Sequence, residues 1–421
     1  MPVLLIVSVA AAGTWEAVSC WLLWRQARAA RRHRDRVPDG FRDAIGPDAH
    51  RRAADYTVAR ARVATADGLV GLAVTLGLLG GGLDRLARLS ERLIPDTAAG
   101  GAIGRDVALI ALVAAVGFLC HLPVSVFGTF VVEKRFGFNR TGPRLFVLDL
   151  VRRIGLSAVL GLPLLAVLFL VMRHGGPFWW LYAWAALLLI GLAAPAIYVR
   201  LVAPLFNRFE PLADAALAAR LDALLRRCGF RASGLFTMDA SRRSSHGNAF
   251  FTGFGRSKRI VLFDTLLDKQ SHEEVEAVVA HELGHFRHRH VLFGIARGAV
   301  TSFVMLAAVG WLARQPWLAP GFGFGHRGDA VSLYAAGVLL GIVTPVLTPL
   351  GNWVSRRNEF QADDFARREV GAAPMVSALT GLARDNASTL TPDPLYALFN
   401  YSHPPVPLRV ARLLRDARAA A

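Results

Sequence analysis

Long uninterrupted runs of apolar residues dominate this chain and alternate with arginine-rich or mixed polar segments. Seven runs are long enough to cross roughly 30 Å of hydrocarbon as helices. They lie at Pro2–Trp24, Val63–Leu83, Val107–Val132, Ile154–Met172, Phe178–Val199, Leu292–Leu312 and Val331–Val354. The pattern therefore predicts a mainly α, polytopic membrane protein with about seven transmembrane helices.

A few polar residues interrupt these runs. The second run contains Asp67, and the sixth contains Arg297 close to one end, where its long side chain can reach the interface. Glu16 and His121 lie well inside the first and third runs. Polar groups in hydrocarbon are costly and usually face protein or water. Two interpretations stay open for Glu16 and His121: they line a hydrated interior cavity, or they make buried structural hydrogen bonds.

The distribution of charge predicts how the chain sits in a bilayer. A formal net charge of +17 could suggest nucleic-acid binding, but the arginines crowd the loops after the first and third runs. The loop after the second run is balanced, and those after the fourth and sixth are short and nearly uncharged. By the positive-inside rule, the odd-numbered loops are cytoplasmic and the N-terminus lies outside. The long fifth loop, Asn207 to His290, and the C-terminal tail then share the cytoplasmic side.

The cysteines, the charge around the first run and the overall composition indicate where the protein is located. Cys20, Cys120 and Cys228 are scattered and have no metal-ligand spacing, so they indicate neither a disulfide framework nor a cysteine metal site. Positive charge follows the first run instead of preceding it, unlike in a cleavable signal peptide. The arginine- and alanine-rich composition is typical of a bacterial protein. We therefore expect an integral protein of a bacterial inner membrane that contacts lipid and no nucleic acid.

The most specific motif runs from His281 to His285 and reads His-Glu-Leu-Gly-His. Residues four apart share a face of a helix, so both imidazoles can bind one metal ion while Glu282 acts on a metal-bound water. Ser271 and Glu274 form a capping-box pattern that predicts where this helix begins. Catalytic zinc needs a third protein ligand and one open position. The motif therefore predicts half of a zinc peptidase site.

The third ligand must come from farther along the chain. A metzincin would place glycine and histidine at positions that hold His288 and Val291 here, so a downstream carboxylate is needed. The best candidate is Glu359, on a second predicted helix after a span that Pro345 and Pro349 should kink. Asp363 lies one turn farther, placed to accept the free ring N–H of a zinc-bound histidine. In the alternative interpretation, Glu359 and Asp363 form a solvated face with nearby arginines. His288 and His290 are expected to form a basic helix end near lipid headgroups and not to be further ligands.

A predicted hairpin precedes the metal-binding helix. Its strands are Asn248 to Phe254 and Arg259 to Phe263, joined by a turn at Gly255 to Lys258. Such a hairpin could offer an exposed edge on which an extended peptide adds as a further strand. An ordinary core hairpin is the equal alternative.

Four further stretches carry a family resemblance. They are Glu133–Thr141 (EKRFGFNRT), Pro204–Leu212 (PLFNRFEPL), Ser245–Phe250 (SHGNAF) and Ser402–Pro405 (SHPP) with Arg409. Together with the zinc motif, they make the chain resemble the zinc-dependent CAAX prenyl endopeptidases, integral-membrane metalloproteases of the gluzincin group. The match extends from about Phe130 to Arg409, and the first hundred residues match mainly in topology.

The resemblance implies a set of roles. One zinc ion per chain would be bound by His281, His285 and Glu359, with Glu282 as the general base. Asn248 and Ala249 would hold the substrate backbone, and His403 and Arg409 would lie near the reacting carbonyl, where either could stabilise the oxyanion. The spans would enclose a large hydrated chamber with the zinc site at its cytoplasmic end.

Three functions are compatible with the sequence. The first is a zinc endopeptidase that cuts near the C-terminus of membrane-associated, CAAX-like or lipid-bearing proteins. The second is a general membrane quality-control protease of the stress-induced type. The third, of another class, is a seven-span transporter or receptor with an incidental zinc motif, although no internal repeat is visible. The oligomeric state stays open and is compatible with a monomer.

These assignments divide the chain into four segments. Residues 1–206 form an N-terminal membrane region with spans one to five, and residues 207–290 a cytoplasmic protease segment with the zinc-motif helix. Residues 291–354 contain spans six and seven. Residues 355–421 form a C-terminal protease segment with the third ligand. We expect the small hairpin or sheet to belong to a gluzincin-like protease domain.

Overall fold

The structure is a computed structural model and describes residues 2–95, 101–230, 233–252 and 259–420. Within these ranges the chain is almost entirely helical, with one small sheet. The turn predicted at Gly255 to Lys258, and the part of the first predicted strand beyond Thr252, lie outside the described residues.

Seven helical segments in the described ranges are long and apolar enough to cross a membrane. They are built from α1 (Val3–Arg32), α2 (Pro47–Gly77) followed by α3 (Leu83–Leu93), α4 (Gly101–Phe127), α5 (Pro143–His174), α6 (Trp179–Ile197), α11 (His290–Leu312) and α13 (Asp329–Val370). Each overlaps one predicted apolar run, which confirms the predicted fold class. Most helices continue beyond the run because arginine and alanine, which flank several runs, favour helix as strongly as the apolar residues do.

The outer faces of these segments are apolar and uncovered. Val159 of α5 and Leu189 of α6 are 70% and 68% exposed, and Val304 of α11 is 59% exposed. Soluble proteins rarely expose so many large apolar side chains on neighbouring helices. A lipid environment explains this surface, because the bilayer core replaces the missing apolar partners.

The remaining elements are short helices and a small sheet, most of them grouped together, with the helix at Leu318–Phe322 at the other end of the molecule. The helices are α7 (Ala203–Phe206), α8 (Ala215–Arg227), α9 (Asp264–Leu267), α10 (His272–Arg287), α12 (Leu318–Phe322), α14 (Ala372–Asp385), α15 (Pro394–Asn400) and α16 (Val406–Ala420). The strands are β1 (Phe209–Pro211), β2 (Leu235–Met238), β3 (Ala249–Thr252) and β4 (Arg259–Phe263), in the order β1-β2-β4-β3. β2 and β4 are parallel, and the other pairs are antiparallel. β3 is therefore an edge strand among the described strands.

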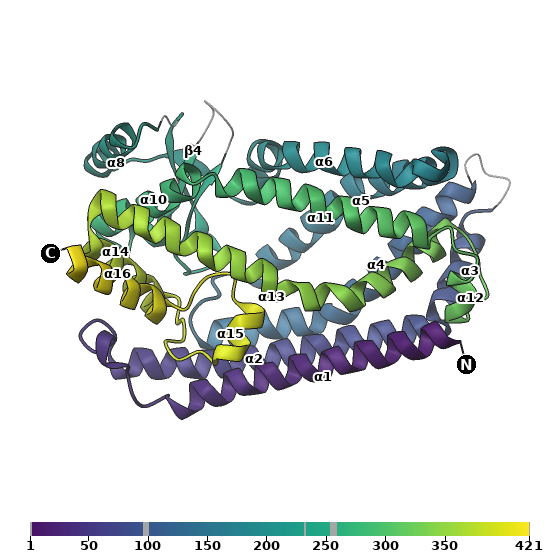
Figure 1. Cartoon of the computed structure of the whole chain (residues 1–421), viewed down its shortest axis with the longest axis horizontal. Coiled ribbons are helices and arrows are strands. Elements are labelled where there is room, and N and C mark those ends of the chain that lie inside the picture. Colours follow the sequence, from purple (N-terminus) through teal and green to yellow (C-terminus); the bar gives the residue numbers. More distant parts are fainter. Residues whose placement is uncertain (1, 96–100, 231–232, 253–258, 421) are drawn as a thin grey trace.

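The helix that carries Glu359 is not separate from the last span. α13 runs without interruption from Asp329 to Val370, through Pro345 and Pro349. Figure 1 shows this ribbon bending partway along its length, which fits the predicted kink, since each proline removes a backbone hydrogen bond. A single helix thus connects the apolar bundle to the group around the sheet.

Two apolar cores stabilise opposite ends of the molecule. One joins β3, β4, α8, α10, α14, α16 and the C-terminal part of α13. The other joins α3, α12 and the neighbouring parts of α4, α5, α6, α11 and α13. In Figure 1 the sheet, α10 and α16 lie at one end, while α3, α12 and the N-terminus lie at the other. The helices between these ends surround interior cavities, described below.

Candidate metal centre

The helix α10 presents both motif histidines from a well-defined start. Ser271 Oγ accepts a hydrogen bond from the Glu274 backbone N–H at 3.3 Å, and Glu274 Oε2 accepts one from the Ser271 N–H at 2.7 Å. The predicted capping box is therefore confirmed. Because the helix starts at His272, His281 and His285 fall on the same face one turn apart.

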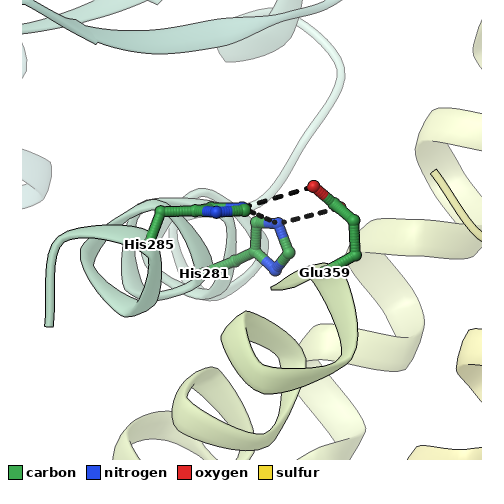
Figure 2. Close-up of side chains that lie close together, drawn as sticks. All are labelled: His281, His285 and Glu359. Atoms are coloured by element: carbon green, nitrogen blue, oxygen red, sulfur yellow. Dashed lines mark hydrogen bonds and ion pairs between the residues drawn. The ribbon is translucent and has the colours of Figure 1, made fainter. Parts of the chain in front are cut away.

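The helix α13 brings Glu359 against this face. Figure 2 shows His281 and His285 projecting from one helix and Glu359 from the other, with their polar ends converging. The two helices approach closely at Gly284, where an added Cβ would lie 2.9 Å from Ala362 Cα. Glycine at this position lets the backbones meet, so a carboxylate 74 positions beyond His285 reaches the histidine pair.

The three side chains have the spacing of a metal-ligand set. The Nε2 atoms of His281 and His285 are 3.3 Å apart, and each lies 3.4 Å from an oxygen of Glu359. Two ligands at about 2.1 Å from a tetrahedral metal ion are roughly 3.4 Å apart. Glu359 is buried, and its Oε2 has no hydrogen-bond partner in the described structure. The arrangement fits a metal ion, which would occupy the common point of these donors.

The other nitrogen of His281 is held by a buried ion pair. Asp363 Oδ1 lies 2.9 Å from His281 Nδ1, which is the contact predicted from the sequence. Asp363 also accepts two hydrogen bonds from Arg409, at 2.5 and 2.8 Å. Burial lowers the pKa of His281, but the carboxylates of Asp363 and Glu359 outweigh it and raise that pKa to about 9. A metal ion binding here must therefore displace a proton from His281.

The other ring nitrogen of His285, Nδ1, contacts His290, which the sequence analysis placed at a basic helix end near lipid headgroups. His285 Nδ1 lies 3.1 Å from Nδ1 of His290, and His290 Nε2 lies 2.8 Å from Gln361 Oε1 of α13. His290 is 9% exposed, so the predicted role at a lipid-facing helix end is wrong for it. The extra turn between α10 and α11, with Arg289 in the left-handed region, turns its ring inward. Only its nearness to the motif could have indicated this contact.

Glu282 and His403 lie beside the donor set, in the same cavity. Burial is the largest influence on Glu282 and raises the pKa of its carboxyl group. His403, in the turn before α16, places Nε2 3.4 Å from Glu359 Oε1 while its side chain stays 65% exposed. Both predicted residues are thus positioned to reach a molecule bound at the metal centre.

The cavity is large and has the edge strand as one wall. It encloses about 1350 Å³ and is lined by side chains from α1, α2, β3, α10, α13, α14 and the segment before α16. Asn248 and Ala249, predicted to hold a substrate backbone, line it together with Phe250 and Phe251. The structure thus brings together every residue that the sequence analysis assigned to the site.

Comparisons with known proteins agree with this arrangement. A family model described as CAAX prenyl protease N-terminal, five membrane helices, matches residues 26–208, and one described as Peptidase family M48 matches residues 211–417. A CAAX prenyl protease 1 homolog from Arabidopsis thaliana is 37% identical, over 68% of each chain. The protein of that name from Mus musculus is 30% identical, over 93% of this chain and 92% of its own.

A solved structure matches nearly the whole chain. The crystal structure of S. mikatae Ste24p has a TM-score of 0.90 and 26% sequence identity, and the match covers 98% of this chain and 99% of that one. These similarities remove support for a transporter or receptor with an incidental motif, and the peptidase family itself implies a metal ion. The chain belongs to the M48 peptidases of the CAAX prenyl protease type and is a membrane-embedded metalloendopeptidase.

Proposed function

We propose that the protein is a zinc endopeptidase in which His281, His285 and Glu359 bind one zinc ion per chain. The observation that carries this proposal is the convergence of the three donors, with ligand atoms within 4.8 Å of one another, beside Glu282 in a large cavity. Two histidines and one glutamate with an open fourth position are a common ligand set of catalytic zinc.

Glu282 is the general base in this proposal. A zinc ion held by His281, His285 and Glu359 would supply Lewis-acid chemistry, polarising the scissile carbonyl and lowering the pKa of the attacking water towards 7. Glu282 takes a proton from the attacking water and delivers it to the leaving amine nitrogen. Burial, which raises the pKa of Glu282, makes its carboxylate a better base, and the proton that it takes up passes to the amine nitrogen as the C–N bond breaks.

His403 and Arg409 then have different tasks. The exposed ring of His403 can donate a hydrogen bond to the oxyanion that forms from the scissile carbonyl. Arg409 is 8% exposed and engaged by Asp363, with Glu359 Oε2 3.7 Å away. It therefore acts as a positioning residue: its charge keeps Asp363 ionised, and Asp363 orients His281.

The substrate is an extended peptide segment. β3 pairs only with β4 among the described strands, and its residues line the cavity, so a peptide can add beside Ala249 in strand fashion. The relatives are named CAAX prenyl proteases, which supports cleavage near the C-terminus of membrane-associated proteins, with or without a lipid. The match of residues 26–208 to that family's membrane domain favours this function over general quality control.

The zinc site faces the cytoplasm in this proposal. The loops richest in arginine adjoin the end of the bundle that carries α10 and α16, and positive loops are retained in the cytoplasm. Together with the arginine- and alanine-rich composition, the loop charges support a bacterial inner membrane with the N-terminus outside.

Metal removal and restoration test the proposal. The purified protein, incubated with a fluorogenic peptide, should contain about one zinc ion per chain, lose turnover on chelation and regain it with stoichiometric zinc. Turnover that persists after complete removal of the metal would contradict it.

A further inference from the structure

A second cavity lies inside the membrane-spanning bundle, remote from the metal ligands. It is bounded by α1, α2, α4 and α13 and encloses about 650 Å³, space for many water molecules at roughly 30 Å³ each. Its polar lining consists of Ser8, Glu16, Asp67, Thr75, His121 and Tyr334. Ionisable side chains at this depth are costly and mark sites that hold water, ions or ligands.

The cavity is lined by acidic side chains. Two carboxylates line it, and among the described lining residues there is no lysine or arginine. Asp67 Oδ1 lies 2.6 Å from His121 Nδ1. Glu16 accepts a hydrogen bond from Cys20 Sγ at 3.3 Å, a weak donor, and no cationic side chain of the described structure pairs with it. A cation entering the cavity would therefore meet at least one carboxylate that lacks an ion-pair partner.

A buried hydroxyl group of the same cavity also indicates a bound ligand. Ser8 lines the cavity and is only 1% exposed, yet its Oγ has no hydrogen-bond partner in the described structure. A buried polar group without a partner destabilises the fold unless a ligand or water satisfies it. Ser8 can accept a hydrogen bond from the ligand that Glu16 attracts.

The lining favours an organic cation over a metal ion. In the described structure, the group of His281, His285 and Glu359 is the one set of at least three histidine, cysteine or acidic residues with ligand atoms within 4.8 Å. Glu16, Asp67 and His121 are thus too widely spaced to share a metal ion. Trp15 and Tyr334 also line the cavity, and aromatic faces bind ammonium and guanidinium groups.

The cavity adjoins others that lead towards the metal centre. His121 also lines an intermediate cavity of about 520 Å³. That cavity shares Arg60, Ser244 and His246 with the cavity of the metal centre. Neighbouring cavities thus lie one after another between the metal centre and the carboxylates, and a peptide held at the metal centre can extend along this series.

We propose that the Glu16–Asp67 cavity binds a lysine or arginine side chain of the peptide being cleaved, an inference that rests on the proposed function. The cationic end lies between the two carboxylates and against the aromatic faces of Trp15 and Tyr334. It donates a hydrogen bond to Ser8 Oγ. The cavity is a specificity subsite, separate from the residues that bind the metal and hold the backbone.

The absence of a side chain at Gly68 leaves room for the Glu16 carboxylate. A Cβ at Gly68 would lie 2.3 Å from Glu16 Oε1, so Gly68→Ala must move the carboxylate. The displaced atoms are the end of a flexible side chain, and the helix backbones can stay where they are. This variant changes the position of the charge without changing its amount.

Matched peptides test the subsite. A series carries one lysine, moved position by position away from the scissile bond, and each member has a partner with uncharged norleucine at that position. For the wild type, kcat/KM should favour lysine at one or a few positions. Because a hydrogen bond to a charged group contributes about 1.5–3 kcal/mol, the lysine-to-norleucine ratio should fall about 10- to 100-fold in Glu16→Gln and Asp67→Asn. Gly68→Ala should lower the same ratio.

The control is Asp48→Asn, which removes a carboxylate from the same helix α2 at a side chain that is 97% exposed. It should leave the ratio unchanged. A wild-type enzyme without lysine preference at any position, a ratio unaffected by Glu16→Gln and Asp67→Asn, or an equal fall in Asp48→Asn would each overturn the subsite. Failure of the wild type to cleave either peptide of any pair would instead contradict the proposed function, and the subsite with it.

Discussion

At the scale of single residues, each histidine of the proposed metal centre has a contact at its second ring nitrogen that fixes the orientation of the ring. Asp363 holds His281, and His290 holds His285, so both Nε2 atoms face Glu359. The four-residue spacing of the histidines predicted their shared face, because helix geometry is local. The contact of His290 could not be predicted, since it depends on a turn whose direction is set by packing against Gln361.

Substitution of the proposed ligand Glu359 should have a different effect from substitution of Asp363, which orients a ligand. Glu359→Ala removes a donor, so the purified protein should lose its metal as well as its turnover. Asp363→Asn should weaken metal affinity by about 10- to 100-fold, as changes in residues that orient a ligand do. Asp364→Asn is the matched control, because Asp364 pairs with Arg412 of α16 as Asp363 pairs with Arg409, but away from the site. Full metal retention in Glu359→Ala would place the third ligand elsewhere.

At the scale of elements, the site depends on how closely α10 and α13 approach. The sequence predicted both helices and the capping box, which are properties of neighbouring residues. It did not predict that Glu359 belongs to the last span itself, because the two prolines suggested a boundary that the helix passes through. It also could not predict which glycine forms the contact, since that depends on partners far away in the chain.

Gly284 offers a test of this contact. In Gly284→Ala the new methyl group would meet Ala362 Cα at 2.9 Å and Phe365 Cβ at 3.1 Å, and the nearest of these atoms is backbone. The helices must therefore separate, and Glu359 should move away from the histidines. We expect metal affinity and turnover to fall by at least about tenfold, by analogy with other changes that misplace a ligand. Gly294→Ala in α11, where no atom lies within 4 Å of the added Cβ, should leave both unchanged. Equal behaviour of the two variants would contradict the close-contact argument.

At the scale of the whole molecule, seven apolar segments and two separate cores hold the metal centre at one end of a membrane bundle. The sequence predicted the segments because their lengths follow from bilayer thickness. The sequence did not predict the position, size or lining of the interior cavities, because these depend on which helix faces meet. The orientation in the membrane rests on the loop charges alone.

Single cysteines in a background without native cysteines test this orientation. Asp222→Cys in α8 and Leu408→Cys in α16 should react with an impermeant thiol reagent only from the cytoplasmic side. Arg314→Cys, just after α11 at the other end, should react only from outside. All three positions are exposed, so differences in labelling report sidedness. Labelling of Asp222→Cys from outside would reverse the proposed topology and the cytoplasmic source of the substrate.

The most direct test of the central claim measures metal content and peptide turnover on the same preparation of Glu282→Gln protein. Glu282 acts on the water and is not a donor, so about one zinc ion per chain should remain while turnover falls about 10²- to 10⁴-fold, the usual contribution of a general base. Retained zinc with turnover close to that of the wild type would contradict the account.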